Sequence, residues 1–187
     1  MFENIPMAIY SSALLLFLQA ASRPRPYPPI DLITGMDSYV EQRSVALVTN
    51  PGDWNAVWQK HKGITPIGTA QNLTFPSLEK PPAVDFDTEE VLVLFGGLAS
   101  QGGYEVVDSE KNAKAITVHI HALPLLGVGP GGSPSSFKAN PYAFIMFKRS
   151  DLPMKVQTAT TDANGNEQWK TVATVGGAPT DNPAGKS

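Results

Sequence analysis

A run of apolar residues from Val91 to Phe95, closed by Gly96 and Gly97, constrains the fold more than any other stretch of the chain. A continuous apolar run of this length between turn signals indicates a strand that is covered on both faces. The strand ends in glycine, whereas a catalytic strand normally ends in a histidine, serine, cysteine or carboxylate. The run therefore predicts a strand that is buried on both faces, and it supplies no candidate catalytic residue.

Composition favours a single β-rich domain. The 187 residues suffice for one domain of the usual size, about 100 to 150 residues, with terminal segments to spare. The chain has 17 prolines, 16 glycines and 17% charged residues, a balance that favours strands and turns over helices. The net charge of -3 argues against nucleic acid as a partner, and the absence of cysteine excludes disulfides, thiolate metal sites and lipid attachment through cysteine.

Periodicity predicts one helix and a series of strands. Residues 50–53 can cap a helix over residues 54–62 that ends at Gly63, with Trp54, Val57, Trp58 and His61 on one face. Strands are predicted at residues 39–48, 91–98, 104–109, 115–122, 142–148, 154–160 and 168–175, and residues 162–166 form a hairpin turn. The predicted fold is mostly β: an antiparallel β-sandwich or a partly open barrel with one packed α-helix, preceded by an N-terminal apolar helix.

The first 22 residues predict either a signal peptide or a retained membrane anchor. Residues 5–21 are apolar and end in small residues that are typical of a signal-peptidase site. Glu3 precedes this segment, whereas Arg23 and Arg25 follow it, which is the reverse of the usual charge order in a secretory signal. We expect membrane contact through residues 5–21 and a periplasmic or other extracytoplasmic domain.

The rest of the chain divides into three parts. Residues 23–38 are rich in proline and predict an extended arm with a free backbone, either a spacer or a strap that binds a partner. Residues 39–175 contain the predicted helix and strands and form the β-rich domain. Residues 176–187 are polar and carry too little apolar surface to fold, which predicts a flexible tail.

Several short motifs follow one another in a recognisable order. Trp54 and Trp58 in the helix precede Val84-Asp85-Phe86, then Gly102-Gly103-Tyr104, then Asn140-Pro141-Tyr142. In this order they resemble the PrcB C-terminal-domain family of bacterial proteins, over roughly residues 53–149. The resemblance implies an extracytoplasmic, non-enzymatic module, because the namesake is an accessory subunit that stabilises a surface protease complex. The namesake type is a lipoprotein, so in this cysteine-free chain the apolar N-terminus is the expected membrane attachment.

The expected function is protein binding, without an enzyme activity or a cofactor. We expect an accessory subunit that stabilises or organises a larger bacterial membrane or envelope complex through protein–protein contacts. Aromatic and arginine side chains outside a core are the usual hot spots of such contacts, and glycines let a partner backbone approach closely. The partner-binding candidates are Arg25, Tyr27, Gly102, Gly103, Tyr104, Phe137, Pro141 and Tyr142. The competing interpretation of Gly102-Gly103-Tyr104 is a turn whose tyrosine plugs the end of the core.

Two other functions stay open. His119 and His121 share one face of a predicted strand and could bind a metal if His61 or Asp85 supplied a further ligand. The loops around residues 101–104, 129–132 and 140–142 occur in the same order as the protease-binding loops of chagasin-like cysteine-protease inhibitors. Clustering of these loops at one end of a sandwich would favour the inhibitor hypothesis.

Overall fold

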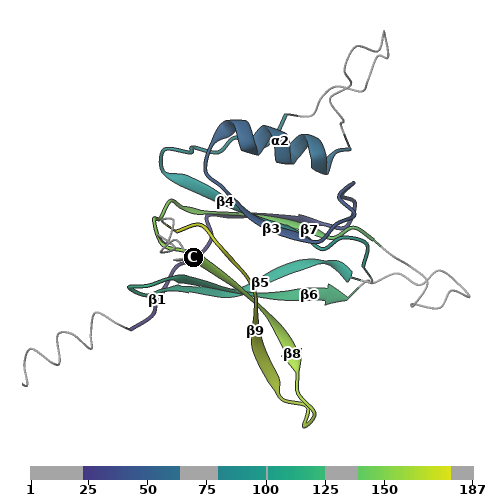
Figure 1. The fold of residues 1–187 in the computed structure, drawn as a ribbon, viewed down its shortest axis with the longest axis vertical. Coiled ribbons are helices and arrows are strands. Elements are labelled where there is room, and N and C mark those ends of the chain that lie inside the picture. Colours follow the sequence, from purple (N-terminus) through teal and green to yellow (C-terminus); the bar gives the residue numbers. More distant parts are fainter. Residues whose placement is uncertain (1–22, 64–79, 100, 125–138, 178–187) are drawn as a thin grey trace, which may run out of the picture.

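The computed structural model describes residues 23–63, 80–99, 101–124 and 139–177, which form three stacked layers (Figure 1). One layer is a four-stranded sheet in the order β2 (Asp31–Gly35), β7 (Tyr142–Lys148), β4 (Glu89–Phe95) and β3 (Ser44–Val48). Another is a five-stranded sheet in the order β1 (Arg25–Pro26), β5 (Gln101–Lys111), β6 (Ile116–Pro124), β8 (Met154–Thr161) and β9 (Glu167–Val175). Helix α2 (Pro51–His61) covers the outer face of the four-stranded sheet.

The prediction of a mostly β fold with one packed helix is confirmed, and two sheets that share a core are consistent with a β-sandwich. The predicted N-terminal apolar helix lies outside the described residues, as does the predicted tail from residue 178 onward. Within the described part of the chain, no helix is long and apolar enough to cross a membrane.

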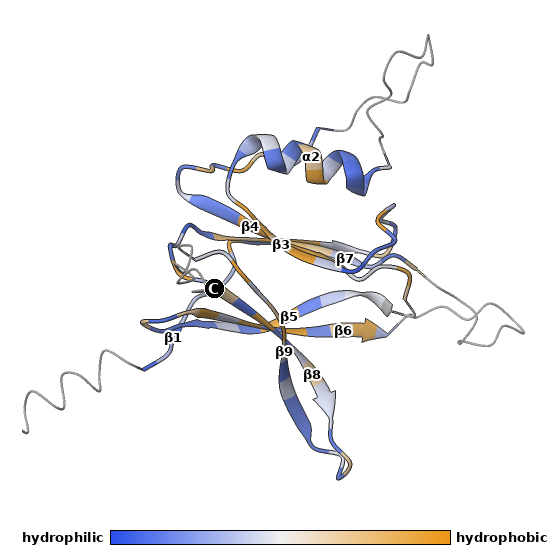
Figure 2. Cartoon of the chain, in the orientation of Figure 1, coloured by the Kyte–Doolittle hydropathy of each residue, from blue (hydrophilic) through white to orange (hydrophobic). Residues whose placement is uncertain are grey.

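The central strands β4 and β7 are buried on both faces, as the apolar run of β4 predicts. Leu92 and Phe147 belong to the core between the two sheets, while Val93 and Phe144 belong to the core under the helix. Each of these four side chains is at most 1% exposed. Figure 2 shows the hydrophobic residues concentrated in this middle layer. The four-stranded sheet is thus the centre of the molecule, with one apolar core above it and one below.

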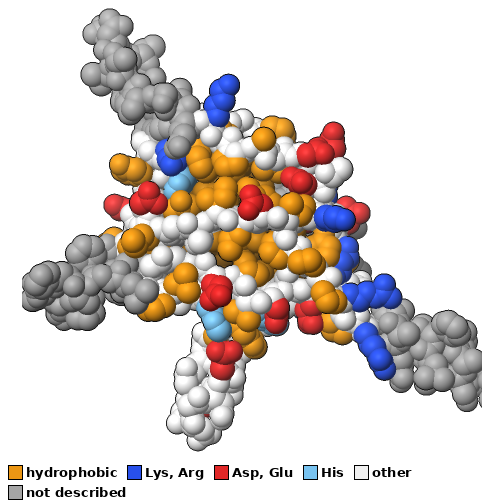
Figure 3. All heavy atoms as spheres, turned by 180° about the vertical axis from the view of Figure 1, so that it is seen from behind, with side chains coloured by type: hydrophobic (Ala, Val, Ile, Leu, Met, Phe, Trp, Pro, Cys, Tyr) orange, Lys and Arg blue, Asp and Glu red, His pale blue; other side chains and the backbone are white. Residues whose placement is uncertain are grey.

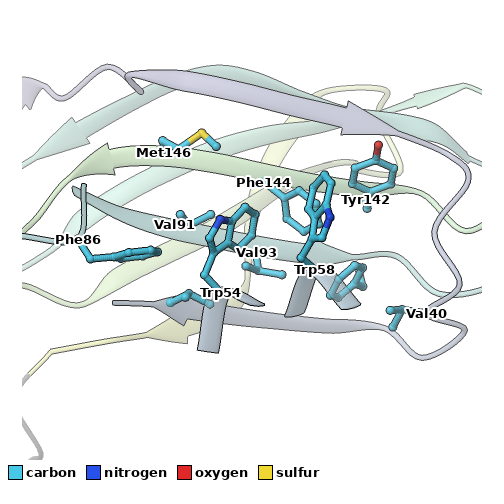
Figure 4. Close-up of a cluster of buried hydrophobic side chains, with 11 residues drawn as sticks. Val40, Trp54, Trp58, Phe86, Val91, Val93, Tyr142, Phe144 and Met146 are labelled. Carbon is cyan, nitrogen blue, oxygen red and sulfur yellow. The ribbon is translucent and has the colours of Figure 1, made fainter. Parts of the chain in front are cut away.

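Helix α2 begins where the sequence provides a cap. The Asn50 side chain accepts a hydrogen bond from the Asp53 backbone N–H at 2.9 Å, and Pro51 occupies the first turn, where its missing N–H costs nothing. Trp54 and Trp58 then point at Phe144 of β7, with ring centroids 5.1 and 5.8 Å away (Figure 4). This aromatic contact holds the helix on the sheet.

The N-terminal segment crosses from one sheet to the other. Arg25 and Pro26 pair with β5 of the five-stranded sheet, and β2 then pairs with β7 of the four-stranded sheet. Between them, the Tyr27 N–H donates to the Ser109 carbonyl at 2.9 Å. This corrects the expectation of an extended arm with a free backbone, because residues 25–35 supply one edge strand to each sheet. Short strands interrupted by prolines give too weak a pattern to be recognised in the sequence.

The C-terminal hairpin joins the five-stranded sheet by a parallel pairing. Residues Ile116 to Ile120 of β6 lie in parallel register with Met154 to Thr158 of β8, so this sheet is mixed and not purely antiparallel as predicted. The β8–β9 turn is the predicted one: the Asp162 side chain accepts hydrogen bonds from the backbone N–H groups of Asn164 and Asn166, and Gly165 has a φ of 84°. The hairpin extends away from the rest of the sheet (Figure 1).

Replacing Gly97 with alanine is expected to destabilise the domain by about 2 to 4 kcal/mol. Gly97 has a φ of 66°, and a Cβ there would lie 2.7 Å from the Glu41 carbonyl oxygen and 2.9 Å from the Arg43 backbone nitrogen. Neither backbone atom can move without shifting the connection into β3. The measurement is the free energy of unfolding in urea.

Gly165→Ala is the matched control for Gly97→Ala. Gly165 also has a positive φ, but a Cβ there meets nothing within 4 Å. The control should therefore cost only the conformational strain, about 1 kcal/mol. Equal losses of unfolding free energy in the two variants would show that the close backbone contacts at Gly97 add nothing to the destabilisation.

Candidate protein-binding surface

Most of the predicted partner-binding residues meet at one corner of the molecule, where β5 and β7 begin. The Thr34 hydroxyl donates to the Tyr142 carbonyl at 3.0 Å and accepts from the Tyr104 backbone N–H at 3.1 Å. This hydroxyl therefore links the two sheets. Gly103, with a φ of 134°, passes directly beside Thr34, where a Cβ would lie 3.1 Å from the hydroxyl oxygen.

The glycines at this corner make room for the two tyrosine rings. A Cβ on Gly96 would lie 2.5 Å from the Tyr104 hydroxyl oxygen and 2.6 Å from a Pro141 ring carbon. A Cβ on Gly35 would lie 2.8 Å from the Tyr142 ring. The two rings thus occupy space that side chains at Gly96 and Gly35 would otherwise fill.

The corner is a packed element rather than an exposed patch. Tyr104 is 6% exposed and Tyr142 is 9% exposed, and Pro141 is buried as well. Burial also raises the pKa of the Tyr104 hydroxyl, with Arg43 acting weakly in the opposite direction. The expectation that Tyr104 and Tyr142 lie outside the core is therefore wrong, and the competing interpretation of a tyrosine that plugs the end of the core describes the geometry.

Of the remaining candidates, Gly102 lies at the same corner, Arg25 and Tyr27 lie in the N-terminal segment, and Phe137 is not described. Arg25 is exposed on β1. The Tyr27 ring is half-buried and stacks on Phe147, with centroids 5.8 Å apart and an interplanar angle of 13°. Gly102 is half-buried at the start of β5. Phe137 lies outside the described residues.

Backbone hydrogen bonds join three connecting segments next to the corner formed by Gly103, Tyr104, Pro141 and Tyr142. The Asn140 N–H donates to the Met36 carbonyl at 3.1 Å, and the Ser38 N–H donates to the Asn140 carbonyl at 3.2 Å. The Leu98 N–H donates to the Glu41 carbonyl at 3.2 Å. The connections after β2, after β4 and before β7 therefore form one continuous layer at this end of the molecule.

Three large apolar side chains stand exposed on this layer. Met36 is 48% exposed, Leu98 is 55% exposed and Tyr39 is 71% exposed. We refer to Met36, Tyr39 and Leu98 as the loop-end surface. Sequence reasoning missed them because Tyr39 and Leu98 were assigned to the ends of predicted strands. The signal available in the sequence was that Met36 directly follows Gly35 and Leu98 directly follows Gly97.

Hydrophobic side chains are also visible elsewhere on the surface. Seen from behind, the molecule carries them across the middle of the face, with most Lys, Arg, Asp and Glu side chains nearer its margins (Figure 3). Among the described residues, Ile30 and Val107 are the other large apolar side chains that are exposed, at 49% and 45%. Neither belongs to the hydrogen-bonded layer of the loop end.

Two of the three inhibitor-like loops, residues 101–104 and 140–142, lie at this same end. Gln101 at the start of β5 pairs with Pro124 at the end of β6, and Phe95 at the end of β4 pairs with Tyr142 at the start of β7. Ala99 and Ala139 exchange backbone hydrogen bonds of 2.9 and 2.8 Å. Residues 129–132 lie outside the described residues.

The histidine pair lies on the outer face of the five-stranded sheet and is occupied by protein contacts. His119 Nδ1 lies 2.5 Å from Asp108 Oδ1, and its Nε2 lies 2.9 Å from Gln157 Oε1. His121 Nε2 lies 3.3 Å from Glu167 Oε2, and both histidine rings pack on Trp169.

His61, one of the two residues considered as a further metal ligand, is the last residue of α2 and packs on the four-stranded sheet, against Tyr142 and Phe144. The described ranges contain no group of three histidine or carboxylate side chains placed to hold a metal ion.

No protein-family model, no curated protein and no solved structure matches this chain.

Proposed function

We propose that this protein is a non-enzymatic accessory subunit that binds a protein partner through the loop-end surface. The observation that carries the proposal is the exposure of Met36, Tyr39 and Leu98 on a layer of connections that is already ordered by backbone hydrogen bonds. Exposed apolar clusters on a soluble surface mark interaction sites. A pre-ordered backbone also lowers the entropic cost of binding, so that more of the buried apolar area contributes to affinity.

The setting of this binding is proposed from the chain's resemblance and its N-terminus. The PrcB-like order of motifs and the apolar residues 5–21 support an extracytoplasmic domain that is attached to a bacterial membrane. In that setting the domain stabilises or organises a larger membrane or envelope complex. The corner formed by Gly103, Tyr104, Pro141 and Tyr142 contributes indirectly, because it packs beside the described connections after β2, after β4 and directly before β7.

The test compares two double variants of the full-length protein, expressed in its native membranes and extracted in mild detergent. Met36→Glu with Leu98→Glu places charge on the loop-end surface. Ile30→Glu with Val107→Glu places the same charge on apolar side chains of similar exposure outside it. We expect the first variant to lose its stoichiometric partner, with at least a tenfold drop in co-purified partner, and the second to retain it. Equal retention by both variants would contradict the proposal.

A protease-inhibitor function is the second candidate, favoured by the clustering of the described loop ends at one end of the fold. It predicts stoichiometric inhibition when a papain-like cysteine protease is titrated with the purified protein. A protease that retains full activity at a severalfold excess of the protein would exclude this function for that class of protease.

A further inference from the structure

A buried carboxyl group lies at the end of the fold opposite the loop-end surface. Glu90, near the start of β4, is 1% exposed and pairs with Phe147 of β7. Its Oε1 atom has no hydrogen-bond partner among the described residues. A carboxylate in such a place must either stay neutral or find a counter-charge, because an unpaired buried charge is costly.

Tyr27 of the N-terminal segment packs beside this carboxyl group. Its ring stacks on Phe147, the residue that pairs with Glu90, and its hydroxyl donates to the Lys148 carbonyl. The Tyr27 N–H and carbonyl both bond to Ser109 of β5, the carbonyl at 2.5 Å from the Ser109 hydroxyl. Since β1 has only two residues, these two hydrogen bonds of Tyr27 extend the short attachment of the segment to the five-stranded sheet.

Lys111 at the end of β5 completes the cluster. Its Nζ lies 5.1 Å from the centroid of the Tyr27 ring, a cation–π contact, and donates to the Ser150 hydroxyl at 3.1 Å. The lysine is therefore held by Tyr27 and Ser150 rather than by Glu90. A lysine ammonium on a flexible stem can exchange these partners for a carboxylate.

The charged groups around Glu90 come from three elements. Lys111 belongs to β5, Arg149 and Asp151 follow β7, and Tyr27 belongs to the N-terminal segment. Burial raises the pKa of Glu90 from 4.5 to about 7. A hydrogen bond from the Ser150 backbone N–H and the positive charges of Arg149 and Lys111 lower this pKa, and the charge of Asp151 raises it. Burial, followed by the Glu90 charge, also raises the pKa of the Tyr27 hydroxyl.

We propose that the N-terminal segment at Tyr27 is a latch that is closed while Glu90 is neutral and opens when Glu90 is ionised. The ionised carboxylate draws the Lys111 ammonium away from the Tyr27 ring and the Ser150 hydroxyl. Tyr27 then loses its cation contact, water reaches the carboxylate, and the two-residue β1 detaches from β5. This goes beyond the proposed binding function, since it concerns how the domain is connected to residues 1–22.

The test measures amide protection in the full chain by NMR. The Tyr27 and Ile30 N–H groups bond to the Ser109 and Met146 carbonyls, so their protection factors report directly on the closed segment. We expect these factors, corrected for intrinsic exchange, to fall at least tenfold between pH 5.5 and pH 8, and the Glu90 carboxyl carbon to titrate over the same range. Glu90→Gln should keep the factors high at both pH values.

Glu105→Gln is the matched control, because Glu105 is an exposed carboxylate on β5. This variant should show the same tenfold fall as the unaltered protein. Protection that does not change with pH in the unaltered protein would overturn the proposal, as would an equal fall in Glu90→Gln. Titration of the Glu90 carboxyl near pH 4.5 would overturn it independently of any variant.

Discussion

Phe144→Ala is expected to lower the free energy of unfolding by about 3 to 5 kcal/mol, a large part of the 5 to 15 kcal/mol that a domain of this size normally has. The Phe144 side chain is fully buried at the centre of the helix-facing core. Its ring contacts those of Trp54, Trp58 and His61, so its removal leaves a cavity between α2 and the four-stranded sheet. Urea unfolding followed by tryptophan fluorescence measures the change.

Phe144→Leu provides a graded comparison for this prediction. Leucine fills much of the cavity and should recover more than half of the loss. Of the three tryptophans that give this signal, Trp54 and Trp58 line the same core and Trp169 lies on β9, so circular dichroism of the strands should accompany the fluorescence. A loss below about 1 kcal/mol for Phe144→Ala would mean that the helix does not depend on this aromatic contact.

Stability is expected to fall as the pH rises from about 4.5 to 7, by about 3 kcal/mol in total from Glu90. The folded state holds the Glu90 proton up to about pH 7, whereas the unfolded chain releases it near 4.5. Between these values the folded state binds more protons, so raising the pH favours unfolding. Above pH 7 the full cost of the buried charge is present.

The measurement of this effect is a series of urea unfolding curves for the unaltered protein and for Glu90→Gln. The difference between the two proteins isolates Glu90 from all other titrating groups. The glutamine variant should be about 3 kcal/mol more stable relative to the unaltered protein at pH 8 than at pH 4.5. A difference that stays constant across this range would show that Glu90 titrates at its ordinary value.

The elements with strong local patterns could be predicted from the sequence. The bounds of β7 coincide with the predicted strand at residues 142–148, and the covered strand, the capped helix and the turn at Gly165 all occur where expected. Each depends on contacts within a few residues, or on a hydrophobic run that only burial on two faces can satisfy. Local patterns of this kind can be recognised without knowledge of the tertiary fold.

The parts that depend on distant contacts could not be predicted. The burial of Glu90 depends on the packing of two sheets around it, and the burial of Tyr142 depends on the close approach of Gly35. Gly35 lies far from Tyr142 in the sequence, and the strands of the second sheet that cover Glu90 follow it in the chain at a distance that no local pattern reports. The exposure of Leu98 was missed because the residue was assigned to the end of a predicted strand, and that of Met36 because the residue was assigned to the extended arm.

The crossing of the N-terminal segment between the sheets determines when in its synthesis the domain can fold. Leu32 of β2 pairs with Ile145 of β7, more than a hundred residues later, and β6 receives its second neighbour only when β8 is available. Such long-range pairing is slow, because the loop-closure entropy is lost before the contacts form. The four-stranded sheet can therefore be completed only after Lys148 has been synthesised, and the five-stranded sheet only after Val175.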